Sequence, residues 1–143
     1  MKRDFRDLFV WQKAMTLVTD VYRVTACFPE EELYGLTSQV RRAAVSIPSN
    51  IAEGQARLTP GEFRQFLGHA KGSLAELETQ LLIAENLGYS AISESLLRDL
   101  TEVRRMLNGL LSSLARRDGK SADDDYPPTH NSELSTQNSP KDA

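Results

Sequence analysis

The chain has 143 residues, 40% hydrophobic and 26% charged, with one cysteine and a formal net charge of −3. Such values fit one globular domain with a single core. The lone Cys27 excludes an internal disulfide and so a secreted disulfide scaffold, and we expect its thiol to be buried and unreactive. No apolar run approaches the ~20 residues that span a bilayer, so we expect a cytoplasmic protein without membrane contact.

The first predicted helix runs over about residues 7–28 and is stopped by Pro29. Its apolar residues form two heptad stripes that together cover roughly 200° of the circumference. A surface helix of a monomer needs an apolar face of little more than ~100°. We therefore expect this helix to contact a second copy of the chain, through Val10, Trp11, Leu17 and Val21. The two stripes are Leu8, Trp11, Met15, Val18 and Tyr22, and Val10, Ala14, Leu17, Val21, Val24 and Phe28.

The second predicted helix occupies about residues 34–55. Its apolar face consists of Leu36, Val40, Ala43, Ala44, Ile47 and Ile51. Pro48 lies inside this pattern, where it removes the hydrogen bond to the carbonyl of Ala44. We expect a kink at that point.

The third predicted helix has a clear start. Thr59 is expected as the N-cap, Pro60 as the first helical residue, and Glu62 as the partner in a capping box. Its core face runs from Phe63 to Ala84, and Leu87 and Gly88 are expected to end the helix. Ser90 is expected to cap a fourth helix over about residues 91–117, whose leucines recur every three to four residues.

These segments predict an all-α protein, with residues 1–117 forming an antiparallel up-down-up-down four-helix bundle. Residues 1–117 carry a net charge of +1 and residues 118–143 a net charge of −4. Because residues 118–143 contain few apolar side chains, we expect them to be a disordered acidic tail.

A line of polar residues accompanies the apolar face of the second helix, and a comparable line follows the third. If these helices are neighbours, the two lines meet and need complete hydrogen bonding. The favoured interpretation is a structural seam that sets helix register or a subunit contact. A binding surface is the alternative, and a catalytic role is the least favoured. The stripe consists of Gln39, Arg42, Ser46, Asn50 and Glu53, with Ser73 and Glu76 from the third helix.

Nothing in the sequence motivates catalysis, a metal or a cofactor, so we expect a protein that is not an enzyme. A di-iron bundle needs Glu-x-x-His pairs, and His69 lacks a glutamate three residues before it. Nucleophilic catalysis needs a serine or cysteine beside a base and an orienting group, which no motif supplies. Gly68 and Gly72 interrupt a helical pattern, and we expect them to allow close approach of a neighbouring helix.

Direct nucleic-acid binding is the alternative function, through arginines on one rim of a ring of subunits. Acidic neighbours dilute these arginines, so a solvated surface is favoured over a phosphate-binding patch. The candidate contacts are Arg41, Arg57, Arg64, Arg104 and Arg105.

Several motifs resemble one bacterial family. They include Val10-Trp11-Gln12-Lys13-Ala14, Phe28-Pro29, Tyr34-Gly35-Leu36, Gln39-Val40-Arg41-Arg42-Ala43, the segment from Ser46 to Gly54, and the segment from Ala70 to Leu77. Over about residues 5–115 the chain resembles the four-helix-bundle proteins encoded in intervening sequences of 23S ribosomal RNA genes. The Ser-Ile-x-x-Asn-Ile-Ala-Glu-Gly segment is the most specific part of this resemblance.

The resemblance implies an antiparallel bundle that assembles as a ring-like homopentamer. The family is also distantly similar to the accessory variability determinant of diversity-generating retroelements, a basic pentameric bundle that binds nucleic acid and a reverse transcriptase. The resemblance and the apolar excess of the first helix together predict a non-catalytic oligomeric scaffold. Its expected partners are further copies of itself, an unidentified protein, and RNA or DNA in a ribonucleoprotein process.

Overall fold

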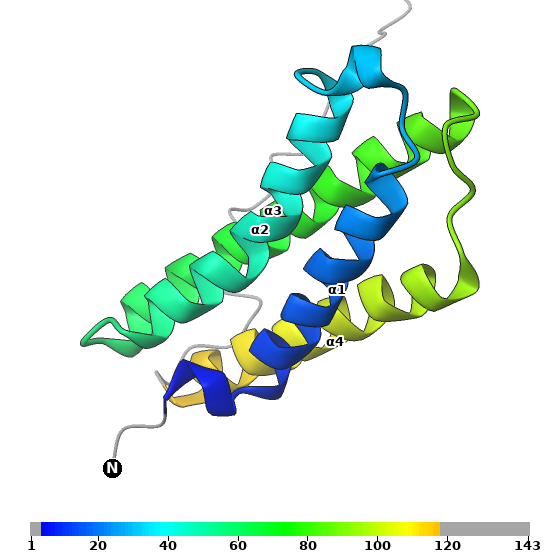
Figure 1. The fold of residues 1–143 in the computed structure, drawn as a ribbon. Coiled ribbons are helices and arrows are strands. Elements are labelled where there is room, and N and C mark those ends of the chain that lie inside the picture. The colour runs from blue at the N-terminus through cyan, green and yellow to red at the C-terminus, as the bar shows by residue number, and fades with distance from the viewer. Residues whose placement is uncertain (1–3, 118–143) are drawn as a thin grey trace, which may run out of the picture.

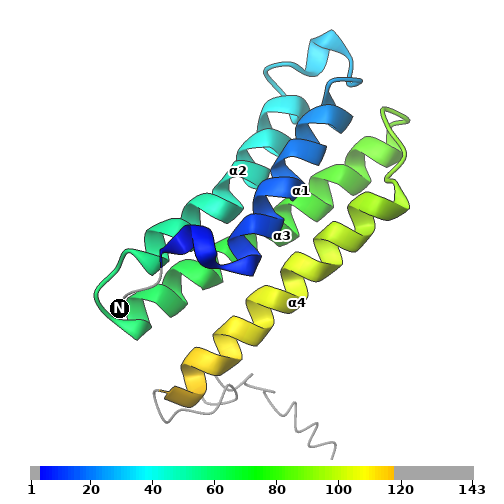
Figure 2. The same cartoon turned by 60° about the horizontal axis from the view of Figure 1, so that its bottom comes forward.

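The computed structural model describes residues 4–117, so the predicted disordered tail lies outside the described residues. Within them the chain forms helices and no strand, which confirms the all-α four-helix prediction. Consecutive helices are joined at alternate ends of the molecule (Figures 1 and 2). The elements are η1 (Phe5–Asp7), α1 (Phe9–Thr25), η2 (Glu30–Glu32), α2 (Leu36–Gln55), α3 (Pro60–Asn86) and α4 (Glu94–Arg117).

Each of the four helices packs on two neighbours. Helix α1 contacts α2 and α4, and α3 contacts the same two helices, with the α2–α3 contact the most extensive. All four contribute aliphatic side chains to one core, whose burial is the main stabilising term. Its fully buried side chains include Leu17 and Val21 from α1, Ile47 and Ile51 from α2, Leu74 and Leu77 from α3, and Val103 and Leu107 from α4.

Helices α2 and α3 are in tight contact at Gly54, one residue before the end of α2. A Cβ atom at this position would lie 2.7 Å from the Cβ of Phe66 and 2.9 Å from Cδ2 of Phe63. Gly68 and Gly72 differ, because a Cβ added there would meet nothing within 4 Å. The expectation that Gly68 and Gly72 allow close helix approach is wrong for this chain, since Gly54 has that role.

The N-caps predicted for α3 and α4 differ in whether the structure confirms them. Thr59 is the N-cap of α3 as predicted, and its Oγ1 accepts a hydrogen bond of 3.2 Å from the backbone N–H of Glu62. The predicted cap at Ser90 is wrong, because Ser93 Oγ accepts the hydrogen bond from the N–H of Leu96. A carboxylate of α3 holds the intervening chain, since Glu85 Oε2 accepts from the N–H of Ile92 at 2.9 Å.

Two local expectations in the first half of the chain concern Pro48 and Cys27. Helix α2 continues through Pro48, which is buried, and the kink expected there stays a prediction. The next two residues donate side-chain hydrogen bonds to carbonyls one turn back, Ser49 to Val45 and Asn50 to Ser46, each at 2.8 Å. The prediction of a buried Cys27 is wrong: α1 ends at Thr25, and the thiol is exposed in the turn that follows. Across residues 4–117, no helix combines the length and apolarity needed to cross a bilayer.

Candidate interaction surface

The two apolar stripes of α1 have different surroundings. The stripe that contains Val10, Leu17 and Val21 faces the core, where these three side chains are buried within one chain. They are therefore not available to a second copy, and the structure corrects these three predicted self-contacts. Trp11 belongs to the other stripe and is half-buried, with its ring edge-on to Phe5 at a centroid distance of 5.2 Å.

We call the other stripe (Leu8, Trp11, Met15, Val18 and Tyr22) the outward stripe. Leu8, Trp11 and Val18 are half-buried against the core, whereas Met15 and Tyr22 are exposed to solvent. Met15 is 42% exposed and Tyr22 is 43% exposed, two turns apart on α1. The neighbouring helix continues this apolar surface through Val45, which is 40% exposed. The chain's own helices therefore cover only part of the excess apolar arc inferred from the sequence, and they leave Met15 and Tyr22 exposed.

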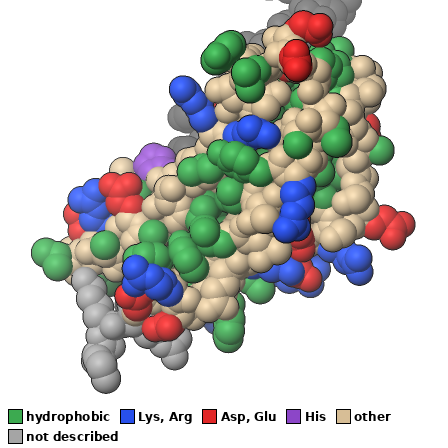
Figure 3. All heavy atoms as spheres, viewed as in Figure 1, with side chains coloured by type: hydrophobic (Ala, Val, Ile, Leu, Met, Phe, Trp, Pro, Cys, Tyr) green, Lys and Arg blue, Asp and Glu red, His purple; other side chains and the backbone are tan. Residues whose placement is uncertain are grey.

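A shallow groove lies where the outward stripe meets α2. Tyr22 and Val45 line it, together with Leu33 and Tyr34 from the α1–α2 connection and the arginines Arg41 and Arg42. Tyr34 is 94% exposed. Hydrophobic side chains gather over this part of the molecule with Lys and Arg side chains beside them (Figure 3). We call this surface, from Met15 to Tyr34 and Val45, the α1–α2 face.

Arg41 holds the groove in shape. Its Nε donates a hydrogen bond of 2.8 Å to Thr25 Oγ1, and its guanidinium carbon lies 4.5 Å from the centroid of the Tyr22 ring. A cation over an aromatic face is attracted by the ring quadrupole. Arg41 also donates to the carbonyl of Tyr22 in the last turn of α1, where positive charge is favourable. The side chain therefore joins the end of α1 to α2 and orients Tyr22.

The predicted polar stripe is brought together only at its centre. Ser46 Oγ on α2 and Ser73 Oγ on α3 share a hydrogen bond of 2.9 Å, and Asn50 Nδ2 donates to Ser46 Oγ at 2.9 Å. All three side chains are half-buried. The hydroxyl pair links the two most closely packed helices, and the amide completes the hydrogen bonding of Ser46. We call these three residues the polar seam.

The remaining members of the predicted stripe are exposed: Gln39, Arg42, Glu53 and Glu76. Glu53 pairs with Arg57 at 3.0 Å, and Glu76 Oε1 accepts a hydrogen bond of 3.1 Å from Gln80. Their interactions are with their own helix or the turn that follows it. Heptad-like spacing placed them beside the seam without bringing them into it.

The candidate nucleic-acid arginines do not share one rim of the chain. Arg41 lies in the second turn of α2 and Arg57 lies two residues past the end of that helix. The sixteen positions between them correspond to roughly 24 Å at 1.5 Å per residue. Arg57 stacks on Phe66 at 4.7 Å from the ring centroid, and Arg104 forms an ion pair with Glu78. Arg64 is half-buried and Arg105 is exposed, on α3 and α4 respectively. The arginines therefore lie on α2, α3, α4 and the α2–α3 turn, and several make contacts within the chain.

An ionic cluster between α1 and α4 is a feature that sequence reasoning missed. Lys13 Nζ lies 2.7 Å from Glu102 Oε2 and 3.2 Å from Asp99 Oδ1, and Asp99 is buried. Hydrogen bonds to Glu102 and then Asp99 raise the pKa of Lys13. Burial raises the pKa of Asp20, and the adjacent Asp99 carboxylate raises it further. The cluster joins residues more than 75 positions apart, and the local sequence of neither helix predicts the ion pairs.

Replacing Asp20 with asparagine is expected to raise the melting temperature at pH 8. The pKa of Asp20 is higher in the folded protein than in the unfolded chain, so the folded protein favours the protonated carboxyl. Stability is therefore lost as the pH rises through the folded-state pKa of Asp20. The gain should shrink as the pH falls toward ~4, where the unfolded carboxyl also binds its proton. Thermal unfolding from pH 8 to 4 measures this, with the exposed carboxylate variant Glu31→Gln as control. A variant less stable than wild type at pH 8 contradicts the expectation.

Fold and surface together define a class: an all-helical bundle with one aliphatic core and an uncovered apolar face on α1 and α2. The family model described as 23S rRNA-intervening sequence protein matches residues 6–109, which is most of the chain. The chain belongs to this family, which confirms the resemblance drawn from its motifs. A comparison with curated proteins finds no match. The similarity to the accessory variability determinant stays a prediction.

Proposed function

We propose that this chain is a non-catalytic, cytoplasmic scaffold whose copies associate through the α1–α2 face. The observation that carries the proposal is the outward stripe, which leaves Met15 and Tyr22 exposed two turns apart on a helix whose other face fills the core. Apolar side chains gathered on one face and rimmed by polar groups are typical of protein–protein contacts. The ring of five copies that the resemblance implies is part of the proposal.

The chemistry of the α1–α2 face supports a protein partner. Tyrosine, methionine and arginine are enriched at the centres of protein interfaces, and all three types line this surface. Tyrosine supplies a large contact area with few rotatable bonds, so its immobilisation costs little entropy. Arg41 already holds Tyr22 in place, which lowers the cost of ordering this side chain on association.

Light scattering on purified variants tests the proposal. The wild type is expected to have the mass of several chains, five if the ring forms. Met15→Glu and Val45→Glu each place a carboxylate on the α1–α2 face, where burial without a partner is costly. Both variants are therefore expected to have the mass of one chain, while circular dichroism retains the helical signal.

The matched control is Leu97→Glu, because Leu97 is an exposed leucine of α4 that lies beside the α3–α4 contact, away from the α1–α2 face. This variant should keep the wild-type mass. A wild-type protein with the mass of one chain contradicts the proposal. If Leu97→Glu dissociates the assembly and the other two substitutions do not, the copies associate through α3 and α4. That result also contradicts the proposed α1–α2 contact.

A further inference from the structure

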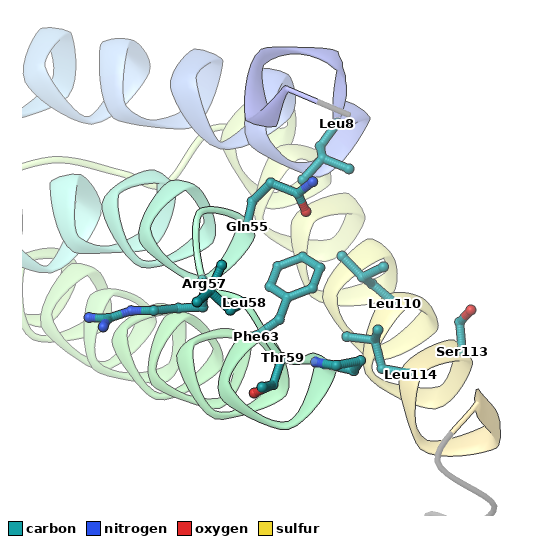
Figure 4. A pocket seen from close by; sticks show the side chains of 11 residues that line it. Leu8, Gln55, Arg57, Leu58, Thr59, Phe63, Leu110, Ser113 and Leu114 are labelled. Carbon is teal, nitrogen blue, oxygen red and sulfur yellow. The ribbon is translucent and has the colours of Figure 1, made fainter. Parts of the chain in front are cut away.

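A second hollow lies at the end of the bundle where α2 turns into α3. It has a volume of about 580 Å³, and its walls come from the start of α1, the α2–α3 turn and the last turns of α4. The aromatic ring of Phe63 points into it between Gln55 and Leu110, with Leu8 and Leu114 on either side (Figure 4). The hollow is separate from the groove on the α1–α2 face.

The walls of this hollow present apolar surface to solvent. Leu58 in the turn is 89% exposed, while Leu8, Phe63 and Leu110 are half-buried around the core. Covering such surface is favourable in proportion to the apolar area removed from water. Four polar side chains also line the hollow, Gln55, Arg57, Thr59 and Ser113, and Gln55 and Ser113 lie on either side of the Phe63 and Leu110 wall. The lining therefore suits a mainly apolar group that carries one hydroxyl, which is the character of a tyrosine side chain.

The chain itself supplies such a group next to the hollow. Residues 118–143 follow directly on α4, and Leu110 and Leu114 in the wall belong to the last two turns of that helix. Among those residues, Tyr126 is followed by two prolines. Returning from residue 117 to Leu110 spans about 10 Å along the helix. The nine residues from 117 to 126 reach up to about 30 Å when extended, so the segment has length to spare.

We propose that the hollow is the docking site for residues Tyr126–Pro128 of the same chain. The Tyr126 ring then packs on Phe63, with its hydroxyl between Gln55 and Ser113, and Pro127 and Pro128 cover Leu58. Proline-rich segments bind aromatic-lined grooves with a small entropic cost, because their backbone is already restricted. Tethering nine residues away raises the effective concentration of the segment at the hollow. The tail thereby caps this end of the bundle, and a proline-rich peptide with the same chemistry competes with it.

Paramagnetic broadening in the full-length chain tests this docking. A nitroxide is placed at Ser132→Cys in a Cys27→Ser background, and the leucine methyl groups carry the isotope label. The methyl signals of Leu8, Leu58 and Leu110 are expected to be lost, while those of Leu33 and Leu87 at the opposite end of the bundle persist. Loss centred on Leu33 or Leu87, or no localised loss, overturns the proposal.

Substitutions then identify the contact. Tyr126→Ala and Leu58→Glu should each restore the lost signals, whereas Leu134→Ala and Leu87→Glu should leave them lost. Broadening that survives Tyr126→Ala overturns the assignment of the anchor. A mixed sample shows whether the docked tail belongs to the same chain or to a second copy. In this sample one population of chains carries the isotope label without nitroxide, and the other carries nitroxide without the isotope label. Full signal in that mixture supports docking within one chain, and broadening there overturns it in favour of a neighbouring copy.

Discussion

Replacing Gly54 with alanine is expected to lower the free energy of unfolding by about 1–3 kcal/mol, the usual cost of forcing extra volume into a packed contact. The new Cβ would lie 2.7 Å from the Cβ of Phe66. A Cβ atom is fixed to the backbone, so α2 and α3 must move apart at this contact. Urea unfolding followed by circular dichroism measures the change.

Gly72→Ala is the matched control for this substitution. Gly72 lies inside α3, is exposed, and has open space where the Cβ would be. Because alanine has the higher helix propensity, the same chemical change should here raise the free energy of unfolding by up to about 1 kcal/mol. Opposite signs for the two variants are the expected result. Equal effects, or a stabilised Gly54→Ala, would show that the α2–α3 contact does not require glycine.

Replacing Lys13 with methionine is expected to lower the melting temperature by several degrees. Lys13 is the ammonium that both Asp99 and Glu102 contact, and Asp99 is buried with the Asp20 carboxyl beside it. Without the cation, a buried carboxylate is left uncompensated at the α1–α4 contact, which is strongly destabilising. Differential scanning calorimetry at neutral pH, with the exposed lysine variant Lys71→Met as control, measures the loss.

A double substitution separates loss of the ion pair from loss of packing. In Lys13→Met combined with Asp99→Asn, no unpaired carboxylate remains at the centre of the cluster. Replacing both partners of an ion pair is generally much less costly than removing one. Most of the lost melting temperature should therefore return. If the double variant is no more stable than Lys13→Met alone, the cluster does not act through charge.

Local signals predicted the helices well and their contacts poorly. The start of α3 was found because Thr59, Pro60 and Glu62 act within one turn. The start of α4 was misplaced at Ser90, because Glu85 on the preceding helix holds the backbone of Ile92 and the helix begins only after Ser93. No pattern within residues 90–94 encodes a hydrogen bond from another helix.

The candidate sites show the same division. Spacing along α2 and α3 placed Ser46, Asn50 and Ser73 on facing flanks, and the structure joins them. The same spacing gave no means to separate them from Gln39 and Glu53, which remain at the surface. The cluster around Lys13 could not be predicted, because its members lie on helices that are distant in sequence and no spacing within one helix pairs them.

Amphipathic periodicity in the sequence alone determined that this is an all-helical, four-helix protein and that α1 carries more apolar surface than one bundle covers. Only the tertiary structure decided which of its two stripes faces the core: Val10, Leu17 and Val21 are buried, while Met15 and Tyr22 stay exposed. Both stripes consist of apolar side chains, so burial of either one is favourable. The rotation of α1 depends on how its side chains fit between α2 and α4, and that fit is a property of the assembled bundle.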